Sequence, residues 1–447
     1  MVHGVFTHFL LEGPRGAVSV AMRLLAVLLS TLVVGTALFS VPPIQDAVTG
    51  LPVEFAEQTR PWSYLIGSPL FGVWDSLSLL TLSQHYAMLS TFVGLYIAWR
   101  MRAAVAGRPA NEATHVVSFA GTAAREMGRA VLAIIALLAF YAAGMALPRP
   151  MTGIRLAEQD RLSIDFHSHT HYSHDGWSLF SAARNRAWHE AGGFDVAYVT
   201  DHYTWAGFDD ADLENPARVG ERTVLLSGAE IRIHQRPTNI LGDRVRYLRA
   251  LDTDSVYMSA DSLEARYRRD GVPPTLLYTM PGRLQYVVPF TEEAPSGVIG
   301  IEINDGSPRG LEQVRSERSD IIALADSMDL ALLGAANLHG WGRTVASWSI
   351  MTIPGWQSMT PIEMGDAIEE VLHRERRNAV QVLERRMPYH GGSPVLAVLT
   401  LPWLTLEHFR MLGLSERLVW LVWIGIAAAI VGRRRLFLPA RLTRDHA

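Results

Sequence analysis

The sequence contains no cysteine among its 447 residues, and lysine is absent as well, so every basic side chain other than histidine is arginine. The lack of cysteine excludes disulfides, thiol nucleophiles, iron–sulfur clusters and cysteine-ligated zinc. The lack of lysine excludes Schiff-base chemistry and the phosphate-binding lysine of P-loop and protein-kinase sites. Any catalysis must therefore use His, Asp, Glu, Ser, Tyr, Arg or a bound metal.

The chain also lacks an excess of positive charge, since its formal net charge is −4. No nucleic-acid partner is expected, because nothing in this balance neutralises a phosphate backbone. Apolar residues, in contrast, make up 49% of the chain, and the mean hydropathy is +0.13. These values suggest membrane segments beside a folded domain.

Four apolar runs predict membrane-spanning helices, because each approaches the ~20 residues that cross the hydrocarbon core. They lie at residues 24–41, 77–99, 130–147 and 418–432, so three fall within a predicted membrane region of residues 1–150 and one within a C-terminal region of residues 394–447. The run at 395–406 contains Pro402 and is expected at the membrane interface. A buried core helix is the alternative for each run.

Arginine orients these spans. It precedes the first span, fills the connection between the second and third, and follows the fourth as Arg433, Arg434 and Arg435. Arginine-rich connections stay in the cytoplasm. We therefore expect an integral protein of a bacterial inner membrane, with residues 148 to about 415 outside the cytoplasm.

Residues 160–393 have the sequence pattern of an α/β domain, in which short apolar strands are separated by helical stretches. Strands are expected at 162–166, 194–199, 224–226, 298–303 and 330–333. Residues 243–292 look like an insertion. A helix is expected from Ser178 to Ala191, and another from Thr360 to about Arg386, opened by a capping box with Pro361 at its first position.

Metal-type ligands follow the predicted strands. They are His167 and His169, His174 and Asp175, Asp201 and His202, Glu230 and His234, and Asn337 and His339. The carboxyl ends of parallel barrel strands converge on one mouth, so these groups should meet there. The alternation of Asp165, His167 and His169 predicts that all three face the same side.

Two imidazoles at i and i+2 can bind one ion, and the two oxygens of Glu230 can bridge two ions. His174 competes with Asp175 for the turn position. Asp201 is expected to orient His202 or the strand end. His171 and His189 are expected to pack or be solvated rather than bind.

The segments IDFHSHTHYSHDG, YVTDHY, LLSGAEIRIH and GAANLHGWGR resemble, in order, the motifs of the PHP (polymerase and histidinol phosphatase) family over residues 160–345. The resemblance implies a distorted seven-stranded (β/α)7 barrel and divalent zinc, manganese or iron. It implies that one ion is held by His167, His169, Glu230 and Asn337, and another by Asp175, His202 and His339, with Glu230 between them.

The sequence departs from the family in two places. Asn337 stands where the family usually has Asp. His234 is the only candidate for two further histidines, because none occurs between it and His339, although Asn239 lies near one of the expected positions. We therefore expect one or two ions.

The resemblance implies a phosphoesterase in which an ion-activated water attacks the phosphorus of a small-molecule ester. Glu230 would take part in catalysis, and Arg343 could bind a phosphate oxygen. Three alternatives stay open: hydrolysis of another bond, a membrane sensor or scaffold that binds metal without turnover, and a transporter that uses His85.

Overall fold

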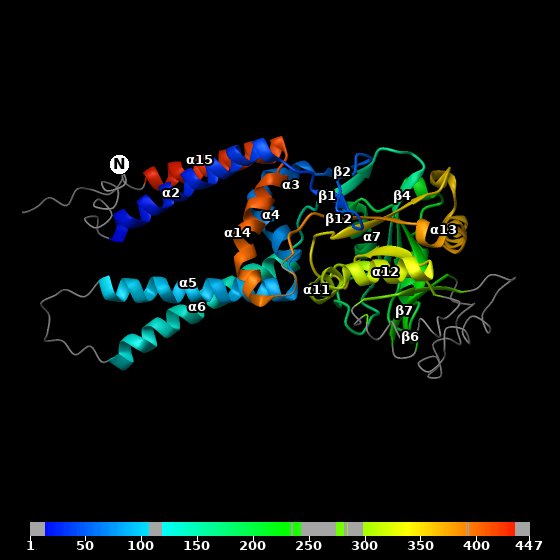
Figure 1. Ribbon diagram of the computed structural model, residues 1–447, viewed down its shortest axis with the longest axis horizontal. Coiled ribbons are helices and arrows are strands. Elements are labelled where there is room, and N and C mark those ends of the chain that lie inside the picture. The colour runs from blue at the N-terminus through cyan, green and yellow to red at the C-terminus, as the bar shows by residue number, and fades with distance from the viewer. Residues whose placement is uncertain are drawn as a thin grey trace, which may run out of the picture.

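A computed structural model of the chain describes residues 14–106, 119–233, 236–242, 274–280, 284, 298–389, 391 and 393–433. It has two parts, a curled sheet with its covering helices and a group of long helices that project from one side of it (Figure 1).

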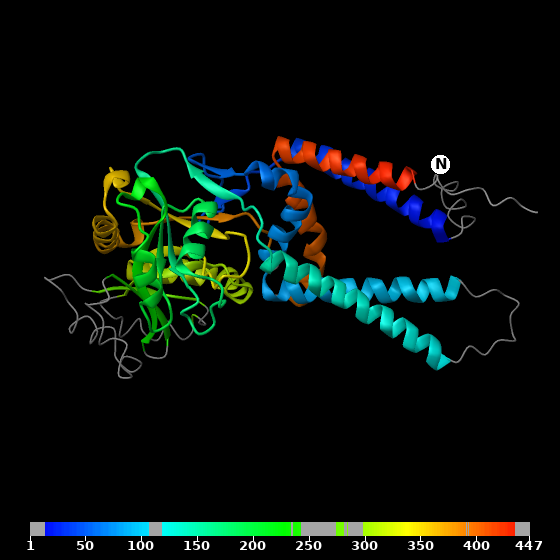
Figure 2. The same cartoon turned by 180° about the vertical axis from the view of Figure 1, so that it is seen from behind.

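The projecting helices form two pairs in both views (Figures 1 and 2). One pair is α2 (Pro14–Gly35) with α15 (Leu414–Arg433), and the other is α5 (Leu82–Ala106) with α6 (Phe119–Ala146). Their directions alternate along the chain. The start of α2, the end of α5, the start of α6 and the end of α15 therefore all lie away from the sheet.

Two helices in the described part of the chain, Met22–Phe39 and Ala124–Ala146, are long and apolar enough to cross a membrane. Pro402–Met411 in α14 (Pro394–Met411) and Leu414–Ile430 meet the criterion only as a pair bent by 117°. The helix of the second predicted span begins five residues later than expected, since α4 (Ser68–Ser78) ends first and Thr81 N donates to Gln84 Oε1 at the start of α5.

The main sheet has ten strands in the order β1-β12-β11-β4-β5-β6-β7-β8-β9-β10. The strands are β1 (Ile44–Asp46), β4 (Arg161–Ser168), β5 (Val196–Val199), β6 (Val224–Ile233), β7 (Arg236–Leu241), β8 (Thr275–Tyr278), β9 (Val298–Asp305), β10 (Ala331–Ala335), β11 (Ser347–Thr352) and β12 (Gln381–Arg385). A separate pair joins β2 (Ala56–Thr59) to β3 (Gly153–Leu156).

The sheet is mixed and strongly curled. Strands β4, β5 and β6 are parallel, as are β8, β9 and β10, whereas β7 is antiparallel to both of its neighbours. Beyond β10, Leu338 forms a parallel bridge with Ser168 at the end of β4. The predicted α/β class is confirmed, and the curl brings the carboxyl ends of β4, β5, β6 and β10 to one place.

Helices cover the sheet. They are α7 (Ala182–Gly192), α8 (Ala206–Asp212), α11 (Pro308–Ser316), α12 (Arg318–Met328) and α13 (Pro361–Glu375). Leu162, Ile164 and Phe166 of β4 are buried in the largest apolar cluster, as alternation predicts.

Two expectations about elements need correction. The capping box of α13 is present, but the helix ends at Glu375 and not near Arg386. Arg376 adopts a positive φ of 48°, which no α-helix accommodates, and the apolar Val382 and Leu383 enter strand β12. The predicted insertion lies partly outside the described residues, and its residues 275–278 form β8 within the main sheet.

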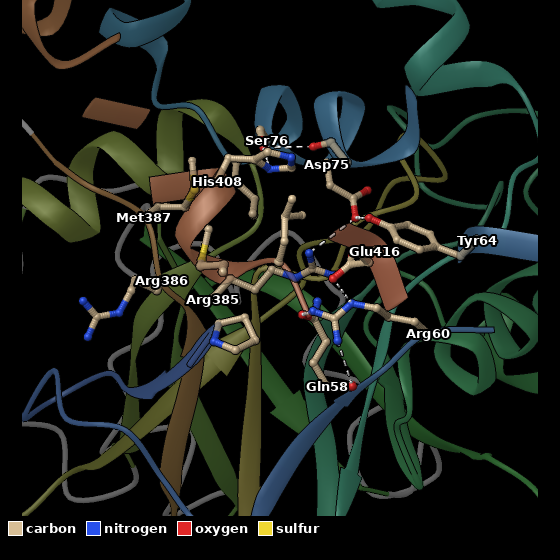
Figure 3. A pocket seen from close by; sticks show the side chains of 15 residues that line it. Gln58, Arg60, Tyr64, Asp75, Ser76, Arg385, Arg386, Met387, His408 and Glu416 are labelled. Atoms are coloured by element: carbon tan, nitrogen blue, oxygen red, sulfur yellow. Dashed lines mark hydrogen bonds and ion pairs between the residues drawn. The ribbon is translucent and has the colours of Figure 1, made fainter. Parts of the chain in front are cut away.

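A polar junction attaches the helices to the sheet (Figure 3). Asp75 of α4 is buried, with Oδ1 2.7 Å from Arg149 Nη2 and accepting a 2.8 Å bond from Thr344. Its Oδ2 accepts a 3.0 Å bond from Tyr64 and lies 3.4 Å from Arg385 Nη1. A pocket of about 450 Å³ opens beside this network, lined by side chains that include Gln58, Arg60, Ser76, His408 and Glu416.

Candidate metal centre

Imidazoles and carboxylates from four strand ends converge as predicted. In the first cluster, His167 Nε2 lies 3.0 Å from His169 Nε2 and 3.1 Å from Glu230 Oε2. The distance from His169 Nε2 to the same Glu230 oxygen is 3.4 Å. All three residues are buried, and each offers an atom that could bind a single cation. This is the first set that the resemblance implies, apart from Asn337.

A second group adjoins the first. His169, His202 and His339 form one possible ligand set, and His174, Asp175 and His202 form another. Asp175 Oδ2 lies 3.3 Å from His339 Nε2 and 3.5 Å from His202 Nε2. The structure therefore brings Asp175, His202 and His339 together. It does not decide between His174 and Asp175, because both lie beside His202.

Glu230 lies between the two groups. Its Oε2 atom is 3.4 Å from His202 Nδ1 in addition to its contacts with His167 and His169, whereas Oε1 accepts a hydrogen bond from Thr279 at 3.3 Å. The shared position agrees with a bridging role. A bridge through two separate oxygens, as expected from sequence, is not the arrangement seen, since Oε2 faces all three imidazoles.

Groups around the cluster contact the Nδ1 atoms of its histidines and so determine which ring nitrogen is free to bind a cation. His339 Nδ1 lies 3.0 Å from the backbone oxygen of Asn337, which can only accept, so Nδ1 carries the hydrogen. His167 Nδ1 lies 2.7 Å from Glu302 Oε1, and His169 Nδ1 lies 2.9 Å from Ser173 Oγ. These contacts direct the Nε2 lone pairs into the cluster, as is usual for metal-binding histidines.

Burial and mutual charges shift the protonation of the cluster. Burial would lower the pKa of His167, but Glu302 and Glu230 outweigh it and hold that pKa well above its ordinary value. Burial, together with the neighbouring imidazoles, holds the pKa of His169 well below its ordinary value. Burial would raise the pKa of Glu230, but His167 and His202 lower it overall. Glu230 is therefore ionised and His169 neutral, which are the forms that bind a cation, whereas His167 releases a proton when a cation binds.

Glu302 of β9 is a member of the site that sequence reasoning missed. It is 1% exposed, holds His167 through Nδ1 and accepts a 2.6 Å bond from Met280 N. Burial raises the pKa of Glu302 to about 7. The signal in the sequence was an acidic residue inside an otherwise apolar strand, IGIEI, which a buried strand accepts only where a partner satisfies it.

Asp201 supports the loop after β4, and within the described part of the chain its carboxylate forms no hydrogen bond with His202. Its two carboxylate oxygens accept bonds from Thr170 N and Thr170 Oγ1, both at 2.6 Å, and Oδ1 also accepts a bond from Ser173 Oγ at 3.1 Å. Asp201 therefore fixes the segment that carries His169 and, through Ser173, the orientation of that imidazole.

Asp165 and His167 do not share their surroundings, contrary to the alternation expected. The pairing of β4 with β5 shifts between Asp165 and Ser168. Asp165 Oδ2 contacts His189 Nε2 of α7 at 2.8 Å, while Oδ1 accepts a bond from Ala336 N. His189 is thus a buried structural partner of Asp165.

Two buried amide oxygens beside the cluster have no hydrogen-bond partner within the described part of the chain. Asn337 donates through Nδ2 to Asp305 Oδ2 at 2.8 Å, and its Oδ1 lies beside the His169 ring without a hydrogen bond of ordinary geometry. Asn239 pairs in register with Glu230 and donates to Phe166 O, and its Oδ1 is also unpartnered. Orphaned oxygens beside this set of imidazoles fit a site for a divalent cation.

The remaining predicted residues stand apart. His234 lies outside the described residues. Arg343 is half-buried, and no described carboxylate pairs with its guanidinium. His171 Nδ1 is buried without a hydrogen bond, and the ring lies against Tyr172, tilted by 35°, rather than joining the cluster.

The sequence matches no protein-family model and no curated protein. Eight solved chains are similar to part of it, and three of them are as follows. PsfC from Pseudomonas syringae is 17% identical at a TM-score of 0.34 and covers 55% of this chain and 99% of its own. A structure from Bifidobacterium adolescentis, provisionally assigned as a metal-dependent phosphoesterase, is 16% identical at a TM-score of 0.30. The match covers 47% of this chain and 96% of its own.

An amidohydrolase from Chromobacterium violaceum with bound sulfate and no metal is 15% identical at a TM-score of 0.29, covering 44% of this chain and 89% of its own. TM-scores of this size do not establish a shared fold.

Proposed function

We propose that this protein is a membrane-anchored, metal-dependent hydrolase of phosphate esters. One observation carries the proposal: His167, His169, His202 and His339, from three different strand ends, surround Glu230 and Asp175 with ligand atoms 3.0 to 3.5 Å apart. His167, His169 and Glu230 are buried, and a buried set of this kind is costly to fold unless a cation satisfies it.

The residues divide into those that would bind and those that position. Glu230, His167 and His169 would hold one divalent cation, and Asp175, His202 and His339 a second. When bound, zinc, manganese or iron supplies a water of lowered pKa and neutralises charge on a phosphoryl oxygen. Glu302, Ser173 and Asp201 orient the imidazoles. Arg343 would bind a phosphate oxygen through its planar guanidinium.

We assign the curled sheet to the distorted seven-stranded barrel of the PHP type. Strands β4 to β10 are consecutive in the sheet, and the bridge between Ser168 and Leu338 joins the first of them to the chain after the last. The four motifs occupy the corresponding strand ends. The antiparallel β7 is the distortion, because it interrupts the repeated βα units.

We further propose that α2, α5, α6 and α15 all cross the membrane. Their alternating directions put the start of α2, the end of α5, the start of α6 and the end of α15 on one side and the curled sheet on the other (Figure 1). Arg100, Arg102, Arg125 and Arg129, in the described parts of α5 and α6, lie on the first side. That side is the cytoplasm by the distribution of positive charge, so the sheet lies outside it.

The test uses the full-length protein in detergent, stripped by a chelator and reloaded with manganese or zinc. We expect hydrolysis of a generic phosphomonoester that needs the metal and is lost in His167→Ala, with Ile362→Ala as an exposed control on α13. Bound metal without turnover of any phosphate ester would overturn the proposal in favour of a metal-binding sensor, and turnover of amides alone would favour another hydrolase.

A further inference from the structure

The mouth of the metal centre faces the projecting helices. Gly342 N, three residues beyond His339, donates a 3.0 Å bond to Met145 O at the end of α6. Helix α11, which follows β9, reaches the start of α5, where Glu312 Oε2 accepts a 3.1 Å bond from Ser83 N. The loop after β10 and the helix after β9 therefore both touch the bases of these helices.

The opposite end of the strands points away from the helices. Asp160, just before β4, accepts a bond from Ile353 N, and Gln159 O accepts one from Trp356 Nε1. These residues lie near α13, which is at the far end of the molecule from α5 and α6 (Figures 1 and 2). The strands therefore run toward the helices, with the metal centre at the near end.

Apolar side chains surround this mouth. Trp341 is 47% exposed and stacks on Trp177 at 5.0 Å, and Leu179 is 58% exposed. We call these three residues the apolar rim. Trp177 N donates to His339 O at 2.9 Å, so the rim is fixed to a residue of the metal centre.

Cationic side chains lie beside the rim. Arg184 donates to Leu179 O, and neither Arg184 nor Arg343 pairs with a carboxylate in the described part of the chain. Arg343 is close enough to Arg149 and Arg184 that their charges, after burial, lower its pKa. Exposed tryptophan next to unpaired arginine is the composition of a surface that sits at the level of lipid head groups.

Helix length places the rim at that level. The apolar window Ala124–Ala146 has 23 residues, which span roughly 35 Å at 1.5 Å each, slightly more than the hydrocarbon core. Met145 is at its end and is bonded to Gly342, the neighbour of Trp341. The end of the apolar window of α6 is therefore in direct contact with the loop that carries Trp341.

We propose that the apolar rim lies in the interfacial layer of the bilayer and that the substrate is an amphiphilic phosphate ester held in the membrane. This inference rests on the proposed phosphoesterase function. The apolar part of the substrate stays among the lipids beside Trp341 and Leu179, while its phosphate reaches the imidazoles. Water supplies the entering oxygen, the P–O bond to the alcohol breaks, and the alcohol oxygen takes a proton and remains in the bilayer as the product.

The absence of cysteine allows a clean test of the rim. The test compares two exposed apolar positions, Leu179 (58% exposed) and Ile362 (79% exposed). Each is changed to cysteine and labelled with a nitroxide on the full-length protein, in vesicles of phosphatidylcholine and phosphatidylglycerol. We expect oxygen to relax the label at 179 more than a water-soluble nickel complex does, and the reverse at 362. Equal, water-like behaviour at both positions would overturn the proposal.

Turnover gives the second arm. The metal-loaded protein should hydrolyse phosphatidic acid in vesicles in preference to soluble p-nitrophenyl phosphate. The double variant Trp177→Ala, Trp341→Ala should lower the ratio of the two kcat/KM values about tenfold, because aromatic area is lost from the interface. An unchanged ratio would refute the membrane-held substrate. Turnover of neither ester would refute the phosphoesterase function itself, and the nitroxide comparison would still decide where the rim lies.

Discussion

At the residue scale, the contacts of the Nδ1 atoms, which face away from the cluster, determine how the Nε2 atoms face into it. Glu302, Ser173 and the Asn337 carbonyl each contact one Nδ1 atom and so leave three Nε2 atoms directed toward the centre. The motifs identified the ligand-type residues from sequence. They did not identify Glu302, because its partner His167 is 135 positions away and only the fold joins them.

Replacing Glu302 tests this control. Glu302→Gln removes the charge that holds His167, and we expect zinc affinity to fall about 10- to 100-fold, the usual effect of losing such a partner. Competition with a chromogenic chelator measures the affinity, and Glu370→Gln on the exposed surface of α13 is the matched control. Equal affinity in the two variants would show that Glu302 does not act through His167.

Asp195 gives a pH-dependent stability. Burial raises its pKa from 3.8 to about 6, although Ser163 N and Oγ donate to its carboxylate at 2.8 and 3.0 Å. The folded state therefore favours the neutral acid. Its stabilising contribution, roughly 2–3 kcal/mol at most, is present below about pH 4 and is lost as the pH rises through about 6.

Denaturant unfolding of the wild type and of Asp195→Asn between pH 4 and 7 measures this effect. In the variant, the free energy of unfolding should decline less between pH 4 and 7 than in the wild type, because the contribution of the neutral Asp195 is absent. Parallel curves for the two proteins would rule out Asp195 as its source.

At the scale of elements, apolar runs and caps predicted where strands and helices begin better than where they end. The capping box at Thr360 fixed the start of α13, whereas its end depends on the backbone of Arg376 and on the burial of Val382 in a strand that pairs with β11. Strand β8 was missed for a similar reason. Four residues in a stretch rich in Arg, Tyr and Pro become a strand only because β7 and β9 flank them.

The junction between α4 and the sheet depends on Asp75. Asp75→Ala would leave Arg149 and Arg385 buried without their carboxylate, and we expect about 3–5 kcal/mol of destabilisation. Tyr64→Phe removes one hydrogen bond from the same carboxylate and should cost only about 1 kcal/mol. Thermal unfolding of the full-length protein in detergent measures both variants. Similar losses in the two would mean that the ion pairs contribute little.

At the scale of the whole molecule, three features share one direction: the long helices, the carboxyl ends of the central strands and the cluster of imidazoles. Sequence predicted the spans and the convergence separately, because each depends on local composition or strand order. It could not predict that the mouth of the metal centre would lie against the base of α6, since that depends on a contact between Gly342 and Met145, 197 positions apart.

The central claim is that this cluster binds a divalent cation, and anomalous X-ray scattering from crystals of the full-length protein grown with zinc tests it most directly. Data on both sides of the zinc edge should show a peak about 2.0–2.2 Å from Glu230 Oε2 and from the Nε2 atoms of His167 and His169. A difference map with no peak among these atoms, at zinc concentrations that saturate binding in solution, would contradict the account.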